Sequence, residues 1–340
     1  MRVSAVAAAG RTLAVVLSPF DTDPVLVEVV RDGLVESVHH GRVAVTGPDG
    51  SLIGALGDPS ALVYPRSASK PLQAVGMVRA GLDLDGELLA LVCASHSGEP
   101  FHLEGARRIL ALAGLDDAAL QDPPDWPIDE VAKEELLRGG GHRTRLAMNC
   151  SGKHAGMLLT SVRLGADPAT YLEPSHPVQR AVEEALADLT GEVPAGPAVD
   201  GCGAPLWAVS LTGLARAFGR LAVDRDPLVT RVATAIRTHP EQVSGTRRDE
   251  LALHRGLPGI VAKAGAESVY AVGLPDGRGV ALKIDDGSTR GRAVAMAGVL
   301  QRLGLSAEVL QQQAHVAVLG GGHPVGEVRP HAPTLEGIGA

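Results

Sequence analysis

The chain has 340 residues, of which 45% are hydrophobic and 21% charged, with a formal net charge of −8 and eight aromatic residues in all. It lacks the basic surface and the stacking side chains of a nucleic-acid-binding protein, so we expect no nucleic-acid partner. No apolar run is long enough to span a membrane, and Arg11 interrupts the apolar N-terminus before any clean cleavage region. We therefore expect a globular cytoplasmic protein with no membrane partner.

Strand patterns stand at both ends of the chain. Apolar and polar residues alternate from 12 to 64 around turn signals at Asp32-Gly33 and Pro48-Asp49-Gly50, which predicts antiparallel strands. AESVYAVGL and GVALKI, separated by the turn Pro275-Asp276-Gly277, predict two further strands. VGEVRP near the C-terminus predicts a last strand.

Helical patterns dominate between these blocks, from about residue 67 to 238. The clearest are ARRILALAGL, HAGMLLTSVRLG, HPVQRAVEEALADLTG, LWAVSLTGLARAFGRL and PLVTRVATAIRTHP. A further helix beginning near Ser288 or Thr289 fits GRAVAMAGVLQRLG. We therefore predict a single α/β (α+β) domain over residues 1–340, with an antiparallel sheet flanked by helices. Its sheet-rich lobes are expected at 1–66 and 255–340, and its mainly helical lobe at 67–254.

Ser67 and Lys70 form an S-x-x-K pair within YPRSASKPLQAVGMV. Because a proline such as Pro71 is harmless only in the first turn of a helix, a helix is predicted to begin at about Ser67. Ser67 and Lys70 then lie one turn apart on the same face, where a neutral lysine amine could take the serine proton. The alternative is a serine N-cap followed by a solvated lysine.

Two later motifs complete the order S-x-x-K, serine motif and K-T-G that is typical of penicillin-recognising enzymes. ASHSGE contains Ser95 and Ser97, and VAKAGAESVYAVGL carries Lys263 at the start of a predicted strand. Lys-Ala-Gly here lacks the threonine hydroxyl of K-T-G, which could bind a substrate carboxylate. The three motifs in this order favour a serine hydrolase.

Two of the three cysteines lie in glycine-containing loops before predicted helices, Cys150 in NCSGKH and Cys202 in DGCGAPLW. Cys93 lies in the apolar run LLALVCAS and is expected to be buried. Helix N-termini favour thiolate over thiol, and two thiolates make half of a tetrahedral zinc site. The residues that could complete such a site are Lys153, His154 and Asp200. A cysteine nucleophile and a buried structural thiol are the alternatives.

With PRSASK, CASHSGE, NCSGKHAGML, DGCGAP and AKAGAESV in this order, the sequence resembles the asparaginase II family, the Rhizobium-etli-type L-asparaginases. The resemblance covers nearly the whole chain, and NCSGKHAGM and DGCGAP are its most specific motifs. It implies a penicillin-binding-protein/β-lactamase-like fold and a homodimer. It also implies hydrolysis of the small-molecule substrate L-asparagine to L-aspartate and ammonia, the reaction of an EC 3.5.1.1 amidohydrolase.

The resemblance also implies the residues of the site. It implies two serine–lysine pairs, which are Ser67 with Lys70 and Ser95 with Lys263. It implies one zinc ion per subunit, with a water beside the protein ligands Cys150, Lys153 and Cys202. Residues expected to contact the substrate or to hydrogen-bond to the metal ligands are Arg66, Ser97, His154 and Asp200. Ser97 is also an alternative to Ser95, and Lys283 is a reserve candidate for the role of Lys263.

Two other functions are compatible with these patterns. The first is a metal-independent glutaminase-like or esterase-like serine hydrolase on the same fold. The second is a non-catalytic binding protein whose cysteines hold a regulatory zinc ion. Within the asparaginase hypothesis, either Ser67 or Ser95 could be the nucleophile.

Overall fold

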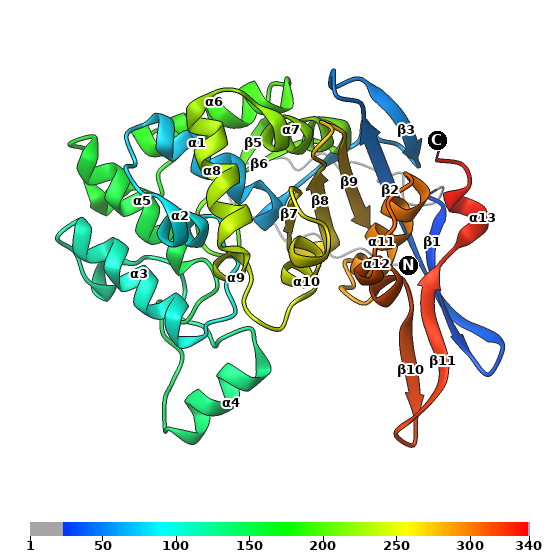
Figure 1. Ribbon diagram of the computed structural model, residues 1–340. Coiled ribbons are helices and arrows are strands. Elements are labelled where there is room, and N and C mark those ends of the chain that lie inside the picture. Colours follow the sequence, from blue (N-terminus) through cyan, green and yellow to red (C-terminus); the bar gives the residue numbers. More distant parts are fainter. Residues whose placement is uncertain (1–22, 339–340) are drawn as a thin grey trace, which may run out of the picture.

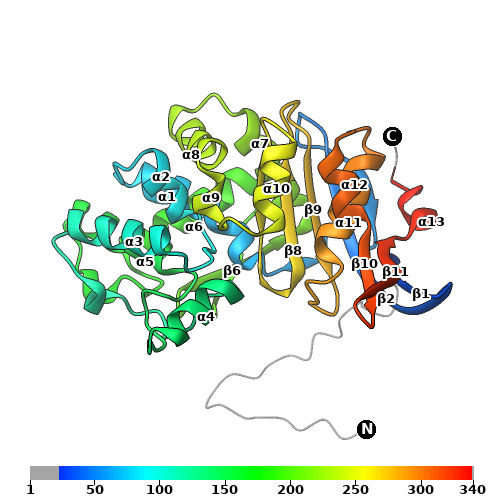
Figure 2. The same cartoon turned by 60° about the horizontal axis from the view of Figure 1, so that its bottom comes forward.

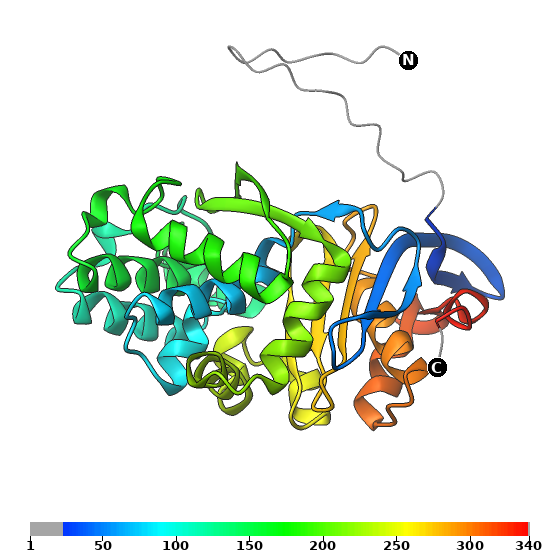
Figure 3. The same cartoon turned by 90° about the horizontal axis from the view of Figure 1, so that it is seen from above.

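The computed structural model describes residues 23–338, so residues 12–22 of the predicted first strands lie outside it. Figure 1 shows a sheet with its covering helices beside a region built mainly from helices. The view from above separates the blue, cyan and green helices of that region from the blue and gold strands of the sheet (Figure 3). No helix of residues 23–338 is long and apolar enough to cross a membrane.

The larger sheet brings the two ends of the chain together. It has eight strands in the order β10-β11-β1-β2-β9-β8-β7, with β3 paired to β2 outside this path, and every pair is antiparallel. Its strands are β1 (Val25–Arg31), β2 (Leu34–Thr46), β3 (Leu52–Leu56), β7 (Val261–Ala264), β8 (Val269–Gly273), β9 (Gly279–Ile284), β10 (Val316–Gly320) and β11 (His323–Pro330). The predicted antiparallel sheet from distant parts of the chain is confirmed.

Local turn chemistry sets the predicted hairpins. Asp32 and Gly33, between β1 and β2, have φ values of 46° and 83°, the backbone that a tight hairpin turn requires and that Asp-Gly adopts readily. Gly277, between β8 and β9, has a φ of 89°. Both turns therefore lie where the sequence places them.

Helices cover both faces of the larger sheet. Helix α7 (Leu211–Val223) packs on β2, β8 and β9, whereas α11 (Arg292–Arg302) packs on the opposite face, with α10 (Asp249–Gly256), α12 (Glu308–Ala314) and α13 (Ala332–Leu335) nearby (Figure 2). The α7 face of the sheet is lined by small residues. A Cβ at Gly273 would lie 1.9 Å from Phe218 O, and one at Gly279 would lie 1.8 Å from Ala215 O. Glycine is required because the helix backbone lies directly on the strands.

The helical region packs against the α7 side of this sheet. Its helices are α1 (Lys70–Arg79), α2 (Gly86–Val92), α3 (Pro100–Leu112), α4 (Glu130–Arg138), α5 (Ser151–Arg163), α6 (Pro177–Thr190), α8 (Pro227–Thr238) and α9 (Pro240–Val243). Helices α1 and α6 pair closely, as do α3 and α5. A second, three-stranded sheet has the order β4-β6-β5, with β4 at Leu62–Val63, β5 at Ala195–Val199 and β6 at Pro205–Ser210.

Two predicted elements need correction. The helix expected over LWAVSLTGLARAFGRL is two elements, because its first residues form strand β6 and α7 begins only at Leu211. All six residues of β6 are buried, and a short, continuously apolar run has no periodicity that separates a strand from a helix. The helix expected from Ser288 or Thr289 begins at Arg292, because Asp286 Oδ1 accepts the Ser288 N–H at 2.8 Å and holds a turn before it. Strand β10 and helix α12 were not predicted.

Candidate active site

Ser67 lies where the chain enters its first long helix. A 3-10 turn over Arg66–Ser69 runs directly into α1, so the predicted helix start and the place of Pro71 in the first turn are confirmed. Arg66 has a φ of 50°, in the left-handed region that a residue with a side chain rarely adopts. Ser67 is partly exposed, and within residues 23–338 no hydrogen bond uses its hydroxyl. This hydroxyl is therefore open to a substrate.

The Lys-Ala-Gly motif lies against the Ser67 turn. A Cβ at Gly265, just after β7, would lie 2.5 Å from Pro65 O and 3.3 Å from Ser67 N. Only a residue without a side chain lets the end of β7 approach the turn so closely. The first and third predicted motifs are thus in contact, although about 200 residues of chain separate them.

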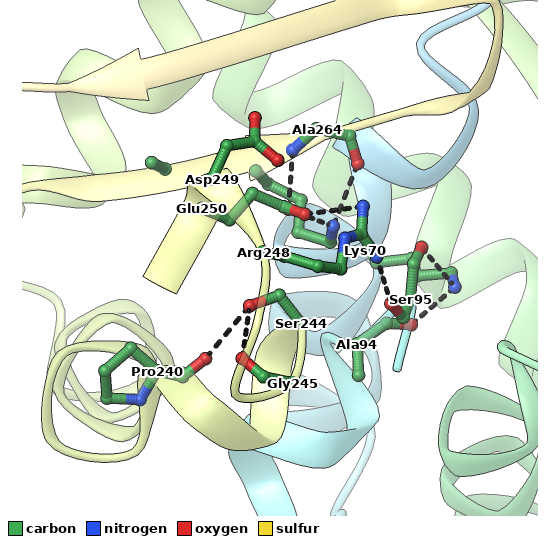
Figure 4. Close-up of polar contacts among 12 residues, drawn as sticks. Lys70, Ala94, Ser95, Pro240, Ser244, Gly245, Arg248, Asp249, Glu250 and Ala264 are labelled. Carbon is green, nitrogen blue, oxygen red and sulfur yellow. Dashed lines mark hydrogen bonds and ion pairs between the residues drawn. The ribbon is translucent and has the colours of Figure 1, made fainter. Parts of the chain in front are cut away.

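Lys70 is buried, and its amine meets the second motif (Figure 4). Lys70 Nζ lies 2.5 Å from Ala94 O, 3.1 Å from Ser95 Oγ and 3.0 Å from Cys150 Sγ. We expected Ser67 as its serine partner, and this pairing stays a prediction, because no hydrogen bond of residues 23–338 joins Lys70 to the Ser67 hydroxyl. The first turn of α1 directs the lysine toward the loop of Ser95, so its hydrogen-bonded serine is Ser95.

Ser95 and Ser97 have different environments. Ser97 is fully buried, and its Oγ donates to Ser244 O at 2.6 Å. A Cβ at Gly245, whose φ is 123°, would lie 2.1 Å from Ser97 Oγ. Ser97 therefore ties its loop to the segment that follows α9. Ser95 instead presents its hydroxyl to Lys70, and it stays the preferred candidate of the two serines.

Lys263 lies in β7 and is fully buried. Its Nζ is 2.6 Å from Glu250 Oε1 and 2.9 Å from Ala264 O. We expected Ser95 as its partner, but no hydrogen bond of residues 23–338 joins the two. Burial lowers the pKa of Lys263 to about 8, although Glu250 acts in the opposite direction. Lys263 is therefore paired with a carboxylate that the sequence reading missed.

The reserve candidate Lys283 lies elsewhere in the sheet. It is partly buried on β9, and its amine donates to Ile284 O. None of its hydrogen bonds within the described chain reaches Ser67 or Ser95. The position of Lys263 beside the Ser67 turn makes it the better candidate for the site.

The two cysteine loops meet at a buried cluster. Cys150 and Cys202 are hydrogen-bonded through their thiols, and Lys153 Nζ lies 3.0 Å from Cys202 Sγ. The three side chains belong to residues that are no more than 3% exposed. The predicted ligand set is thus brought together, and Lys70 joins it to Ser95 through its contact with Cys150 Sγ.

The charges of this cluster balance each other. The hydrogen bond with Cys202, together with burial, raises the pKa of Cys150. The same hydrogen bond lowers the pKa of Cys202, and Lys153 adds to this effect. Burial acts to lower the pKa of Lys153, but the charges of Cys202 and Cys150 outweigh it and raise that pKa. Without a metal the cluster therefore favours one thiolate beside one ammonium.

Arg66 links the Ser67 turn to the Cys202 loop. Arg66 Nε donates to Asp200 Oδ1 at 2.6 Å, and Asp200 Oδ2 lies 3.7 Å from Cys202 Sγ. The unusual backbone of Arg66 thus accompanies an ion pair that holds two parts of the site together. Both residues were predicted to belong to the site.

His154 lies next to the cysteine cluster and close to Asp122, a carboxylate that was not predicted. His154 Nδ1 is 2.7 Å from Tyr171 Oη and 4.0 Å from Asp122 Oδ1. Asp122 is fully buried, and neither of its carboxylate oxygens has a hydrogen-bond partner among residues 23–338. Burial raises the pKa of Asp122 to about 7. The sequence QDPPDW has no periodic signal that would mark Asp122 as buried.

A profile of the L-asparaginase II family matches residues 27–330, which include every site residue named above. The chain belongs to the L-asparaginase II family. The resemblance drawn from the motifs is thereby confirmed, and this family member is an amidohydrolase that acts on a small molecule. No curated protein matches the chain.

Solved structures with similarity to this asparaginase II family member include a beta-lactamase and a glutaminase. The beta-lactamase of Mycobacterium bovis is 14% identical over 73% of this chain and 88% of its own, with a TM-score of 0.36. A Bacillus glutaminase is 13% identical over 78% of this chain and 91% of its own, with a TM-score of 0.35.

The donor set of the family member fits a zinc ion. Two sulfur donors and one amine, from Cys150, Cys202 and Lys153, converge in a buried cluster, and thiolate ligands are typical of zinc. In residues 23–338 no group of three or more His, Cys, Asp or Glu side chains is placed to hold a metal. The ligand set implied by the resemblance has two cysteines and a lysine, so it is not a group of this kind.

A surface pocket of about 290 Å³ lies between α3 and α4. Gly98, Leu103, Pro127 and Leu136 are among its lining residues. No serine, lysine or cysteine of the site lines it, so it lies beside the site and not in it.

Proposed function

We propose that this chain is an L-asparaginase that hydrolyses the side-chain amide of L-asparagine through a serine nucleophile. The observation that carries the proposal is the 3.1 Å contact of Lys70 Nζ with Ser95 Oγ, in a chain of the L-asparaginase II family. An amide needs a nucleophile and a group that moves its proton, and these two side chains are within hydrogen-bond reach of each other.

The reaction proceeds in two stages. Ser95 Oγ forms a bond to the side-chain amide carbon while its proton passes to the Lys70 amine. The carbon–nitrogen bond then breaks, the proton passes to the departing nitrogen, and ammonia leaves an aspartyl ester on Ser95. Water adds to this ester, and cleavage of its bond to Ser95 Oγ releases L-aspartate and restores the hydroxyl. Ser67, which is partly exposed, is the second candidate nucleophile.

Cys150, Lys153 and Cys202 would hold one zinc ion per subunit, which supplies a Lewis acid when bound. Lys153 must lose its proton to serve as a ligand, and so must both thiols. Arg66 and Asp200 hold the Cys202 loop against the Ser67 turn through their 2.6 Å ion pair. His154 interacts with Cys202 of the same cluster, and its Nδ1 lies 2.7 Å from Tyr171 Oη.

Ammonia release from L-asparagine, compared with L-glutamine, tests the proposal directly. We expect release from asparagine, and a preparation treated with chelator should lose activity and regain it with zinc. Glutamine hydrolysis that is indifferent to chelator would instead support the metal-independent alternative. A fully zinc-loaded protein that releases ammonia from neither substrate would contradict the enzyme proposal and favour a binding role.

We also propose a homodimer in the cytoplasm, as the family resemblance implies. Light scattering coupled to size-exclusion chromatography should give twice the 34.9 kDa mass of the chain. A mass of one chain at working concentrations would contradict it.

A further inference from the structure

Four consecutive charged residues at the start of α10 each form an ion pair. Arg247 pairs with Asp129, Arg248 with Glu250, Asp249 with Arg292, and Glu250 also with Lys263. A run of charges on a helix usually marks a solvated face, but Glu250 is fully buried. A buried carboxylate is tolerated only when cations or hydrogen-bond donors compensate its charge. The partners of Glu250 therefore indicate its role.

Both oxygens of Glu250 face cations or donors. Oε1 accepts from Lys263 Nζ at 2.6 Å and from Ala264 N at 2.9 Å, and Oε2 lies 2.8 Å from Arg248 Nη2. Burial acts to raise the pKa of Glu250, but Arg248, Lys263 and Arg292 outweigh it and hold that pKa well below its usual range. Glu250 is therefore an anion that binds both the Lys263 side chain and the backbone of Ala264 at the end of β7.

Arg248 extends the chain of contacts to the reactive loop. Its Nη1 donates to Ser95 O at 2.8 Å while its Nη2 faces Glu250 (Figure 4). Lys263, Glu250, Arg248 and the Ser95 backbone thus form one continuous series of charge-assisted contacts from β7 to the loop after α2. Such contacts fix the relative positions of the residues that they join, because the interaction energy weakens steeply when either partner moves.

We propose that Glu250 and Arg248 are positioning residues, which hold the Lys263 ammonium and the Ser95 backbone in a fixed relation. The inference rests on the proposed function only in taking Ser95 as the reacting residue. Lys263 is held in this arrangement with its amine bonded to Glu250, on the strand whose end lies beside the Ser67 turn. Lys70 is left as the amine that meets the Ser95 hydroxyl.

The charge state of Lys263 depends on several facing groups. Burial is the main influence and lowers its pKa, which is about 8 in the intact site. Glu250 raises this pKa, whereas Arg248 and Lys70 lower it. The other titratable groups that face Lys263 are Cys93 at the end of α2 and His254 of α10. Removing Glu250 should therefore lower the Lys263 pKa, and removing Arg248 should raise it.

Two variants with opposite expected shifts test the proposal. Glu250→Gln keeps the shape of the side chain and removes its charge. Arg248→Met removes the guanidinium, and because Arg248 is partly exposed, this change is expected to disturb the core less. The chain has five lysines, so protein with ¹³C-labelled lysine gives a small set of signals, of which Lys263→Met assigns one. We expect the Lys263 signal to titrate near pH 8 in the parent, at least one pH unit lower in Glu250→Gln, and higher in Arg248→Met.

Kinetics and a control separate positioning from stability. Glu250→Gln should lower kcat about 10- to 100-fold at pH 7, the range for losing a group that orients a functional side chain, and should move the pH profile in the direction of the lysine signal. Asp249→Asn breaks the neighbouring ion pair with Arg292 and should leave both the Lys263 titration and the profile in place.

An unchanged Lys263 titration in Glu250→Gln and Arg248→Met would overturn the proposal. If Glu250→Gln does not fold, the parent and Arg248→Met titrations still test it, because a neutral Lys263 at pH 7 in the parent contradicts a fixed Lys263 ammonium. A parent that releases no ammonia from asparagine would overturn the proposed function alone, since the lysine titration is measured without substrate.

Discussion

Lys70 Nζ lies 3.1 Å from Ser95 Oγ, although 25 residues separate the two in the chain. The same amine lies 3.0 Å from Cys150 Sγ, so one buried lysine connects Ser95 with the cysteine cluster. In this arrangement the amine lies within hydrogen-bond distance of three atoms, Ala94 O, Ser95 Oγ and Cys150 Sγ. Lys70 therefore contacts both the candidate nucleophile and the cysteine cluster.

Ser95→Ala should abolish most of the ammonia release, with kcat lower by about 1,000-fold or more, because it removes the proposed nucleophile. Ser67→Ala should retain more activity than Ser95→Ala. Ser161→Ala is the matched control, since Ser161 is buried in α5 and its hydroxyl donates to Met157 O of the same helix at 2.8 Å. Equal, parent-like rates in the Ser95 and Ser67 variants would show that neither serine is the nucleophile.

Cys202→Ser should weaken zinc binding by more than about 100-fold, because a hydroxyl is a far poorer zinc ligand than a thiolate. Zinc content of protein purified without chelator, measured by elemental analysis, checks this. Zinc affinity should also fall as pH falls, since protons compete for the thiolates and the lysine amine.

Cys93→Ala is the control for the zinc experiment. Cys93 is fully buried at the end of α2, and burial raises the pKa of its thiol to about 12. Its removal should leave zinc content unchanged. Tight, full zinc binding by Cys202→Ser would remove Cys202 from the ligand set.

Asp122→Asn should stabilise the protein above neutral pH. The pKa of Asp122 rises from 3.8 to about 7 on folding, so the folded protein holds a proton that the unfolded chain has released. This contribution to stability is present at low pH and is lost as pH rises from about 4 to about 7. We expect the variant to gain about 2 kcal/mol in unfolding free energy at pH 8 and much less at pH 4.5.

Urea unfolding of both proteins at the two pH values measures the Asp122 effect. Asp83→Asn, at an exposed residue paired with Arg163, should change stability by less than about 0.5 kcal/mol at either pH. A gain from Asp122→Asn that is the same at pH 4.5 and pH 8 would show that the Asp122 charge is not its source.

Gly273→Ala should destabilise the protein by about 3 kcal/mol, because the new Cβ must push α7 off the sheet. The nearest atom to that Cβ would be Phe218 O at 1.9 Å. Gly139→Ala is the control, because a Cβ there meets only ordinary contacts at 3.5 Å. Equal unfolding free energies of the two variants would contradict the close approach of α7 to β8.

The predictable part of the fold was local. The Asp32-Gly33 turn and the periodic helices α5, α6 and α8 follow from backbone preferences and residue spacing within a few turns of chain. Strand β6 was misread because its six residues are all buried and carry no period. Asp122 and Glu250 were missed because nothing local distinguishes a buried carboxylate from a solvated one.

The sequence by itself determined the candidate site residues: Ser67, Ser95, Lys70, Lys263 and the two loop cysteines all lie in the motifs on which the family resemblance rests. Only the tertiary structure decided their partners. Lys70 meets Ser95, and Lys263 meets Glu250, because the packing of α1, α10 and β7 sets which side chains share a buried space. Motif spacing constrains a single turn of helix, whereas contacts between distant segments depend on how whole elements pack.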